Sequence, residues 1–248
     1  MGKKRVSLTL EEDLVEKIDA EADNRDINRS QTVEKIIDSY FKGRGLETAV
    51  ILCGDDENKT LNLYEGKPVL GHILENLAAQ AFSRVILLSG SNRSEIEKQF
   101  GSSYDGMALE YVEDEAEGTA AALSKVEEKI NEAFVALNGH VVADVDLEDM
   151  LRVHREEDGA ATMALTTASS PSRYGVARLK GRKILGFEEK PEVGEEPSQL
   201  INAGTYVLET EIFRHLNAES LEKAFENLAD EGLLSGYIYG GEWKDIDR

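Results

Sequence analysis

Residues 48–157 alternate between short apolar runs and segments in which apolar residues recur at helical spacing, and few folds accommodate this alternation. The apolar runs lie at residues 48–53, 84–89, 109–113 and 133–138, and the helical segments lie at residues 69–81, 93–100, 118–131 and 146–157. Strands and helices in this order form an α/β fold with a doubly wound sheet. Further strands are expected at residues 161–167, 174–180, 183–188 and 203–209, then a helix near residues 219–231 and a last strand near residues 234–240. The chain is therefore predicted to be an α/β protein with a mixed, Rossmann-like sheet.

The first 44 residues follow a different pattern and are too few to bury a core of their own. Polar and apolar residues alternate over residues 4–10, which predicts a strand. A helix is expected to follow it, and after a turn at residues 24–27 either Asn28 or Ser30 should cap a second helix. The inward residues of the second helix are expected to be Val33, Ile36, Ile37 and Tyr40. One strand and two helices in about 40 residues require a partner chain. The predicted domains are therefore residues 1–44 and residues 45–248.

Charge is distributed unevenly along the chain, and this limits where nucleic acid can bind. The formal net charge is −21. Residues 1–44 contain nine basic and ten acidic groups, so the remaining residues carry a net charge of −20. A domain this acidic repels nucleic acid, which leaves the basic tip Lys3-Lys4-Arg5 as the candidate contact.

Three further features of the sequence bear on location. No run of about 18 apolar residues occurs, so neither a membrane-spanning helix nor a membrane partner is expected. The basic N-terminus is followed by alternating residues rather than by the apolar stretch of a secretion signal. The single cysteine excludes an internal disulfide and favours a reducing, cytoplasmic location.

Residues 3–43 resemble the ribbon-helix-helix family of DNA-binding repressors. The resemblance implies that two chains pair their strands into a ribbon whose outward residues enter the DNA major groove. The implied DNA contacts are Lys3, Arg5, Ser7 and Thr9 on the ribbon, and Asn28, Arg29 and Ser30 at the start of the second helix, where free N–H groups meet phosphate. The alternative is a dimerisation cap that never contacts DNA. With either function, a homodimer or homotetramer is expected.

Residues 48–247 resemble the nucleotidyltransferases that join a sugar 1-phosphate to a nucleoside triphosphate. Seven short motifs in order carry the resemblance: Gly66-Lys67-Pro68-Val69-Leu70, Glu117-Gly118-Thr119-Ala120-Ala121-Ala122-Leu123, Leu137-Asn138-Gly139, Tyr174-Gly175-Val176, Phe187-Glu188-Glu189-Lys190-Pro191, Asn202-Ala203-Gly204-Thr205-Tyr206 and Trp243-Lys244-Asp245-Ile246. The resemblance implies that Glu113 and Gly118 hold a nucleobase. It also implies that Gly175, Glu189 and Asn202 line a sugar pocket beside Lys190, which would meet the phosphate. The alternative is that the glycines and Asn202 are turn residues needed only for folding.

The sequence departs from this family at the phosphate loop. Active members carry a glycine-rich loop with a threonine and an arginine after the first strand, whereas here the corresponding residues are Cys53-Gly54-Asp55-Asp56-Glu57-Asn58-Lys59. Only Lys59 stands where active members retain a lysine. Carboxylates that face a polyphosphate repel it, and nucleotidyl transfer depends on positive charge and positioning. No catalytic residue is therefore predicted.

A second departure is His140, which stands where the family has a magnesium-binding aspartate. Asp245 is the other family carboxylate. Magnesium prefers oxygen ligands, and an imidazole suits zinc or copper better. No cofactor is expected with certainty; a divalent metal at His140 and Asp245 is the one considered. The remaining candidates, His72, His154 and Cys53, are interpreted as structural, and Trp243 as packing the C-terminal end.

These features together favour a DNA-binding transcription regulator that senses a nucleotide-sugar or sugar phosphate in a degenerate nucleotidyltransferase domain. The first alternative is an active nucleotidyltransferase that uses its N-terminal module only to form oligomers. The second is a DNA-binding protein whose large domain is a scaffold. The retained sugar-side motifs beside a changed phosphate loop favour the sensor.

Overall fold

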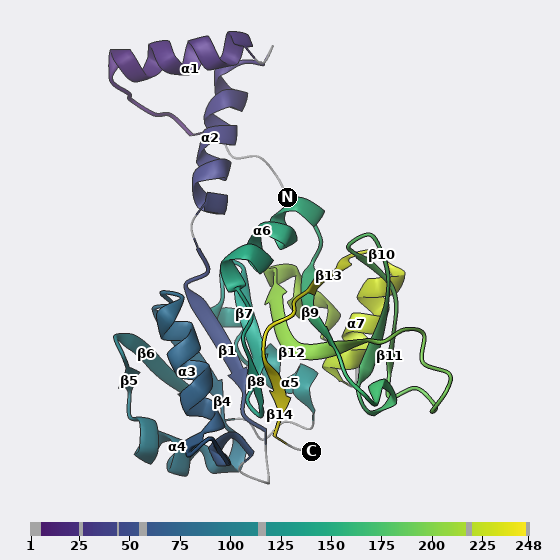
Figure 1. Cartoon of the computed structure of the whole chain (residues 1–248). Coiled ribbons are helices and arrows are strands. Elements are labelled where there is room, and N and C mark those ends of the chain that lie inside the picture. The colour runs from purple at the N-terminus through teal and green to yellow at the C-terminus, as the bar shows by residue number, and fades with distance from the viewer. Residues whose placement is uncertain are drawn as a thin grey trace. The chain divides into compact units, whose positions relative to one another are not determined.

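The structure is a computed structural model of the whole chain and describes residues 6–24, 27–43, 45–54, 59–113, 118–216 and 220–246 (Figure 1). It consists of two compact units, Met1–Gly45 and Leu46–Arg248. Among the helices in these ranges, none is long and apolar enough to cross a membrane.

The N-terminal unit contains the two predicted helices, α1 (Glu12–Asn24) and α2 (Arg29–Gly43). Asn28 caps α2, because its Oδ1 accepts a hydrogen bond from the Gln31 N–H at 2.9 Å. The Gln31 side chain accepts in return from the Asn28 N–H at 3.0 Å. This reciprocal pair satisfies two backbone donors that a helix start leaves without partners. Of the two expected caps, Asn28 is therefore correct, and Ser30 lies inside the helix.

Several apolar residues of the N-terminal unit were predicted to be buried but are exposed in the single chain. Residues 6–10 form no strand, and Val6 and Leu8 are exposed. The predicted inward residues Ile36 and Ile37 are also exposed, at 47% and 43%. The strand is missing because a strand needs a neighbouring strand to bond with, and the described part of this unit offers none. Ile36 and Ile37 are exposed because a unit this small has too few residues to cover them.

A ten-stranded mixed sheet forms the centre of the second unit, in the order β10-β11-β13-β9-β12-β7-β1-β4-β6-β5. Its strands are β1 (Thr48–Leu52), β4 (Arg84–Leu88), β5 (Ser103–Tyr104), β6 (Met107–Val112), β7 (Phe134–Asn138), β9 (Ala161–Thr167), β10 (Gly175–Lys180), β11 (Lys183–Glu189), β12 (Leu200–Leu208) and β13 (Leu234–Ile238). β1 pairs in parallel with β4 and β7, β4 with β6, and β13 with β9. β12 runs antiparallel between β7 and β9. The predicted doubly wound, mixed α/β sheet is confirmed.

Helices cover both faces of this sheet. α3 (Val69–Ala79), α4 (Arg93–Phe100) and α6 (Leu147–Glu157) bury apolar residues in one core cluster, which includes Ile51 of β1. α5 (Thr119–Ser124) and α7 (Leu221–Asp230) do so in a second cluster, which includes Val50. Neighbouring residues of a strand point to opposite faces, so Val50 and Ile51 belong to different clusters. All five residues of β1 are buried, as expected for a strand covered on both sides.

Besides β5, four short strands and one interrupted helix were not predicted. The strands are β2 (Leu63–Tyr64), which pairs with β3 (Lys67–Pro68), and β8 (Val141–Ala143), which pairs with β14 (Trp243–Asp245). Two or three residues carry too little alternation to reveal a strand. The helix expected over residues 118–131 ends at Ser124 and is followed by the 3-10 helix η3 (Glu127–Lys129). Val126 and Ile130 remain buried at helical spacing, which is why the pattern indicated one continuous helix.

Candidate functional site

The predicted ligand-binding residues gather at one edge of the sheet. The parallel strands β1, β4, β6 and β7 end there, and antiparallel β12 begins there, because Thr205 pairs with Leu137 near the end of β7. Val176 of β10 pairs with Ile201 of β12. This pairing brings Gly175 close to Asn202, although 26 residues separate them in the sequence. Ligands in open α/β sheets bind at the carboxyl ends of strands, so this edge is the candidate site.

Gly175 lies under two side chains that leave no room for a larger residue. A Cβ at this position would be 2.8 Å from the Glu189 Oε2 and 2.8 Å from the Phe187 Cε2. Gly175 pairs with Glu189 across the β10–β11 hairpin, which sets this close approach. Packing alone thus requires a glycine here, whether or not a ligand also approaches it.

Glu189 and Lys190 form an ion pair at the end of β11, with Nζ and Oε1 3.4 Å apart. Lys190 adopts a positive φ of 48°, and its N–H donates to the Tyr174 carbonyl at 3.1 Å. Its side chain is 57% exposed, so solvent and a ligand can both reach the ammonium group. A carboxylate beside an ammonium suits a sugar hydroxyl next to a phosphate.

Asn202 is held by the irregular start of β12. Its Nδ2 donates to the Tyr206 hydroxyl at 2.8 Å, and its Oδ1 accepts from the Gly204 N–H at 2.9 Å. Gly204 has a φ of +75° and packs against the Asn138 side chain. Tyr206 is buried, and burial raises the pKa of its hydroxyl. Asn202 is thus positioned by internal bonds, and its second amide hydrogen is what it can offer a ligand.

Two aromatic residues that the sequence analysis did not assign to the site lie beside it. Tyr174 and Trp243 meet edge to face, with ring centroids 5.3 Å apart and planes at 80°. The Trp243 Nε1 donates to the Ala203 carbonyl at 3.2 Å. In the sequence, only their positions next to predicted site residues indicated them: Tyr174 precedes Gly175, and Trp243 lies two residues before Asp245. Together they connect β10, β12 and β14 around the candidate sugar pocket.

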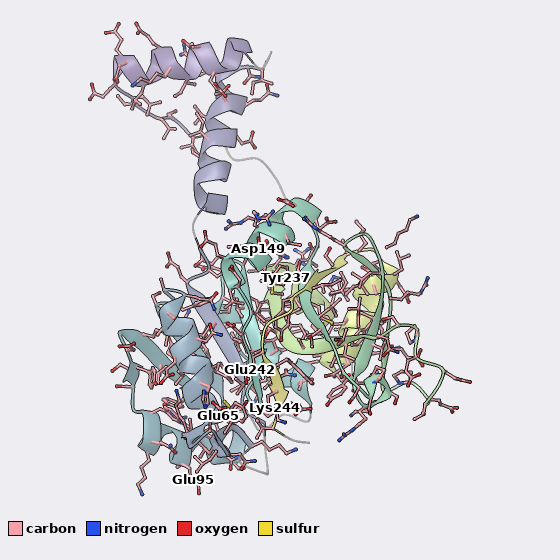
Figure 2. All side chains as sticks on the ribbon, in the orientation of Figure 1. Glu65, Glu95, Asp149, Tyr237, Glu242 and Lys244 are labelled. Carbon is pink, nitrogen blue, oxygen red and sulfur yellow. The ribbon has the colours of Figure 1, made fainter. Side chains whose placement is uncertain are left out.

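Glu242 and Lys244, on either side of Trp243, connect the site to the rest of the unit. Figure 2 labels Glu242 and Lys244 on this segment. The Tyr64 hydroxyl donates to the Glu242 Oε1 at 2.7 Å, which links the β2–β3 hairpin to the start of β14. Lys244 pairs with Val142 in the short β8–β14 sheet. The C-terminal segment that carries Trp243 and Asp245 is therefore held by contacts on both sides.

The predicted nucleobase residues lie on either side of a segment outside the described residues. Glu113 follows β6 and lies 4.0 Å from the Arg93 Nη1, which belongs to the first turn of α4. Gly118 precedes α5 with a φ of +97°. Glu113 directly follows the parallel strand β6, and Gly118 directly precedes α5. Residues 114–117 between them are not described.

Only the two ends of the altered phosphate loop are described. Lys59 begins a short 3-10 helix, η1 (Lys59–Leu61), in which the Thr60 hydroxyl donates to the Cys53 carbonyl at 2.9 Å. The loop carboxylates Asp55, Asp56 and Glu57 lie outside the described residues. Cys53 is buried, and burial raises the pKa of its thiol to about 12. A thiol that stays protonated is a poor nucleophile, so Cys53 is structural.

His140 and Asp245 are brought together by the β8–β14 pairing. Asp245 pairs with Val141, and the Ile246 N–H donates to the His140 carbonyl at 3.0 Å. Asp245 is only 8% exposed. Among the residues with described placement, no group of three or more His, Cys, Asp or Glu could hold a metal ion. Asp245 offers a carboxylate oxygen, the kind of ligand that magnesium prefers, whereas His140 offers an imidazole nitrogen, which suits zinc or copper better.

In the N-terminal unit, the predicted DNA contacts are placed unequally. Ser7, Thr9 and Ser30 are exposed, whereas Lys3 and Arg5 lie outside the described residues. Arg29 binds Asp19 in bidentate fashion, at 2.6 and 2.5 Å. The carboxylate raises the pKa of Arg29, and the guanidinium lowers that of Asp19. Arg29 would have to share or leave Asp19 to contact a phosphate.

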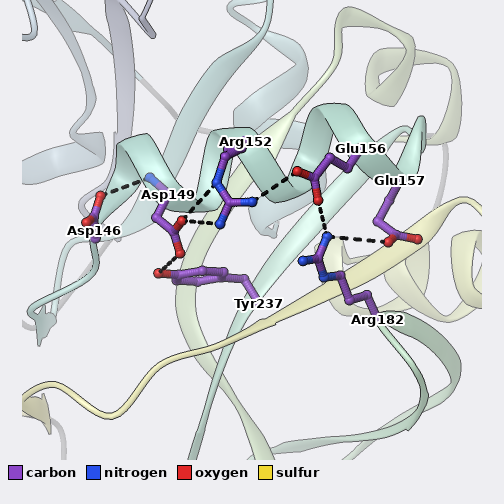
Figure 3. Close-up of polar contacts among 7 residues, drawn as sticks. All are labelled: Asp146, Asp149, Arg152, Glu156, Glu157, Arg182 and Tyr237. Atoms are coloured by element: carbon purple, nitrogen blue, oxygen red, sulfur yellow. Dashed lines mark hydrogen bonds and ion pairs between the residues drawn. The ribbon is translucent and has the colours of Figure 1, made fainter.

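The exposed face of α6 carries a network of ion pairs instead of a free positive patch (Figure 3). Arg152 bonds Asp149 and Glu156, and Arg182 from the β10–β11 turn bonds Glu156 and Glu157. The Tyr237 hydroxyl donates to Asp149 at 3.0 Å, and Asp146 caps the helix. Carboxylates outnumber guanidinium groups in this network, so the face does not suit nucleic acid.

Both histidines interpreted as structural have protein partners. The buried His154 lies 2.8 Å from the Thr162 hydroxyl and 3.4 Å from the Glu209 carboxylate. His72 lies 2.9 Å from the Tyr64 carbonyl. Neither histidine is part of the candidate site.

Comparison with known families decides what the second unit is. The family model described as nucleotidyl transferase matches residues 52–246. The chain belongs to the nucleotidyl transferase family. In the same chain a second model, described as a ribbon-helix-helix protein of the copG family, matches residues 4–42. Both resemblances, and their order along the chain, are confirmed.

Curated relatives of this chain include two proteins named as sugar-phosphate guanylyltransferases. It is 32% identical over 201 residues to the mannose-1-phosphate guanylyltransferase catalytic subunit beta of Danio rerio. The match covers 77% of this chain and 55% of the relative. The chain is 31% identical over 181 residues to the D-glycero-alpha-D-manno-heptose 1-phosphate guanylyltransferase of Aneurinibacillus thermoaerophilus, covering 71% of this chain and 76% of the relative. The chain spans about half the length of the first of these relatives.

Solved structures confirm the fold of the unit. A putative glucose-1-phosphate thymidylyltransferase from Bacillus anthracis superposes with a TM-score of 0.69 at 22% identity, covering 80% of this chain and 89% of that one. A UDP-glucose pyrophosphorylase complexed with UDP-glucose superposes with a TM-score of 0.71 at 19% identity, covering 82% and 94%.

Proposed function

We propose that this chain is a DNA-binding transcription regulator whose nucleotidyltransferase unit senses a nucleotide-sugar or sugar phosphate. The observation that carries the proposal is a ribbon-helix-helix module on the same chain as Gly175, Glu189 and Asn202, the predicted sugar-side residues that the strand pairings bring together. The phosphate side of that pocket has changed, since the loop carries three carboxylates and position 140 carries an imidazole.

The sugar side supports binding of a phosphorylated sugar. Glu189 and Lys190 offer an acceptor and a cation 3.4 Å apart, beside the aromatic pair of Tyr174 and Trp243. Asn202 is held in place by internal hydrogen bonds, so binding costs little ordering of its side chain. A site fixed in advance suits recognition even where catalysis is lost.

The exposed apolar residues of the N-terminal unit support a dimer. Val6 and Leu8 lie on a segment without a strand partner, and Ile36 and Ile37 of α2 are exposed. A second copy would supply the pairing strand and cover these residues, as in a two-chain ribbon. Homodimers or homotetramers built in this way would present Lys3, Arg5, Ser7 and Thr9 to DNA, with residues 28–30 at the phosphates.

Sensing requires that the ligand distinguish two arrangements of the protein. A ligand changes DNA affinity only by the difference between its affinities for those arrangements. We propose that ligand binding at the sheet edge changes how two DNA-binding modules are placed relative to each other. The ligand and the operator DNA would then affect each other's binding by the same factor.

Calorimetric titration with UDP-, GDP- and dTDP-sugars and with sugar 1-phosphates tests the ligand part. We expect heat with at least one of them and a loss of affinity of about ten-fold or more in Lys190→Ala, which removes the phosphate-side cation. Lys180→Ala is the matched control, because Lys180 is an exposed lysine at the other end of β10. Absence of binding heat with all of these ligands would contradict the sensor hypothesis.

An active transferase that uses its N-terminal module for oligomerisation is the second candidate. The names of the curated relatives, which are guanylyltransferases, and the retained Asp245 favour it. Incubation with sugar 1-phosphates and nucleoside triphosphates, followed by detection of pyrophosphate, tests it. Turnover that Asp245→Ala abolishes would establish the enzyme and overturn the sensor.

A further inference from the structure

We infer that a cavity between α3 and β8 is a second ligand site, which takes a small uncharged molecule with a short apolar part and one hydrogen-bonding group. The inference goes beyond the proposed function. Gly175, Glu189 and Lys190 do not line this cavity, and its test needs neither a sugar nor DNA.

The cavity lies between α3, β7, β8 and β12, and α3 contacts β8 beside it (Figure 1). Its walls are mainly apolar side chains, among them Ile73, Leu77, Val141 and Leu147. The enclosed part measures about 30 Å³, which is room for about two water molecules, and it is partly open to solvent. A sugar ring is too large for the enclosed part, whereas the end of a smaller molecule fits it.

Side chains of α3 hold the walls of the cavity in place. Asn76 Nδ2 donates to the Ala143 carbonyl of β8 at 3.1 Å. Gln80 Nε2 donates to the Val145 carbonyl at 3.2 Å, and Gln80 Oε1 accepts from the Leu147 N–H at 2.7 Å. These bonds fix α3 against the segment from β8 to the start of α6, so the cavity is present without a ligand. A preformed site loses little conformational entropy when it binds.

Two polar residues at the cavity retain hydrogen-bonding capacity. Thr205 lines the cavity and is 2% exposed, and its hydroxyl has no hydrogen-bond partner among the described residues. His72 also lines the cavity, and its Nε2 donates to the Tyr64 carbonyl at 2.9 Å, so Nδ1 of the neutral ring can accept. Because buried hydroxyl groups are normally hydrogen-bonded, a ligand group is expected beside Thr205. An amide or a hydroxyl group can both donate and accept, which suits these two residues.

The lining of the cavity also determines the charge of the ligand. Among the described residues that line it, none is an aspartate, glutamate, lysine or arginine. A carboxylate or an ammonium group would lose its hydration there without gaining a partner of opposite charge. The ligand should therefore be uncharged.

Asn138 connects the cavity to the candidate functional site. Its side chain lines the cavity and packs against Gly204, whose N–H donates to the Asn202 Oδ1 at 2.9 Å. A ligand in the cavity would therefore contact a side chain that supports the start of β12, where Asn202 lies.

Binding of propanamide to the full-length protein, measured by saturation-transfer NMR, tests the site. Propanoate is the matched control, because it has nearly the same shape but a negative charge. Wild-type protein should bind propanamide with a dissociation constant of about 1–10 mM, as expected for so few heavy atoms, and propanoate about ten-fold or more weakly. High salt in both titrations screens the net charge of the chain, which would otherwise repel propanoate. Equal binding of the two molecules, or no saturable binding of propanamide, would overturn the inference.

Two variants test whether propanamide binds in the cavity. Thr205→Val keeps the shape of the side chain but removes the hydroxyl, and it should weaken propanamide binding about five-fold or more. The control Thr167→Val makes the same change at the exposed end of β9 and should have no effect.

Ala143→Leu should fill the cavity and abolish propanamide binding, whereas Ala108→Leu, at an exposed position of β6, should bind as wild type does. Unchanged binding by Thr205→Val or by folded Ala143→Leu would overturn the inference. Circular dichroism shows whether Ala143→Leu folds. If it does not, Thr205→Val and the comparison of propanamide with propanoate decide.

Discussion

Trp243 and Tyr174 meet edge to face at 5.3 Å, and this contact ties the C-terminal strand β14 to the start of β10. The Trp243 Nε1 also donates to the Ala203 carbonyl of β12. Three segments that are distant in the sequence are thereby joined next to Gly175, Asn202 and Asp245. The aromatic pair thus packs β14 against the proposed sugar-binding residues.

Trp243→Leu should lower the free energy of unfolding by about 2–4 kcal/mol, because it removes the aromatic contact and leaves the Ala203 carbonyl without its donor. Urea denaturation measures this change. Leu185→Ala, which truncates an exposed residue of β11, is the control and should cost less than about 0.5 kcal/mol. Equal effects from the two variants would show that Trp243 does not join these segments.

Gly175→Ala should destabilise the protein by about 1–3 kcal/mol, since its methyl group would collide with Phe187 and the Glu189 carboxylate. Gly186→Ala lies in the same hairpin, and its added Cβ would approach no atom closer than 3.9 Å. Thermal unfolding should therefore give a lower Tm for Gly175→Ala and an unchanged or higher Tm for Gly186→Ala. A wild-type Tm for Gly175→Ala would show that the hairpin relaxes without cost.

Cys53 should remain a protonated, unreactive thiol in the folded protein, because burial raises its pKa to about 12. The unfolded thiol ionises near pH ~8.5. Above that pH the unfolded state releases a proton that the folded state keeps, so the free energy of unfolding should fall as pH rises. Urea denaturation from pH 7 to pH 10 should show this fall more steeply for wild type than for Cys53→Ala. Identical slopes, or rapid alkylation of native Cys53 by iodoacetamide, would contradict the assignment.

Arg5→Ala should weaken sequence-specific DNA binding by about 1–3 kcal/mol and leave the oligomer intact. The control Arg152→Ala removes an arginine that is ion-paired on α6 of the second unit, where no DNA contact is predicted. Fluorescence anisotropy with genomic fragments captured by the wild-type protein measures the affinity, and analytical ultracentrifugation measures the oligomer. Equal DNA binding by Arg5→Ala and wild type would assign the N-terminal ribbon to dimerisation alone.

The sequence predicted the central fold because burial on both faces leaves a strong pattern. β1, β4 and β7 are nearly continuous apolar runs, and their positions were predicted to within one residue. The proximity of Gly175 and Glu189 could be predicted only from the family resemblance, because it depends on the register of a hairpin. The strands β8 and β14 could not be predicted, since three-residue strands carry no usable periodicity, and the proximity of His140 and Asp245 was expected only from the family resemblance. The N-terminal strand was predicted from alternation, but alternation cannot provide the partner chain that the strand requires.

The most direct test of the sensor is the DNA affinity of the full-length protein with and without the sugar ligand. Fluorescence anisotropy with a captured operator fragment measures both dissociation constants under the same ionic conditions. The proposed function predicts a change of about five-fold to 150-fold on addition of saturating ligand, and no change in Lys190→Ala. Identical dissociation constants with and without a ligand that calorimetry shows to bind would contradict it.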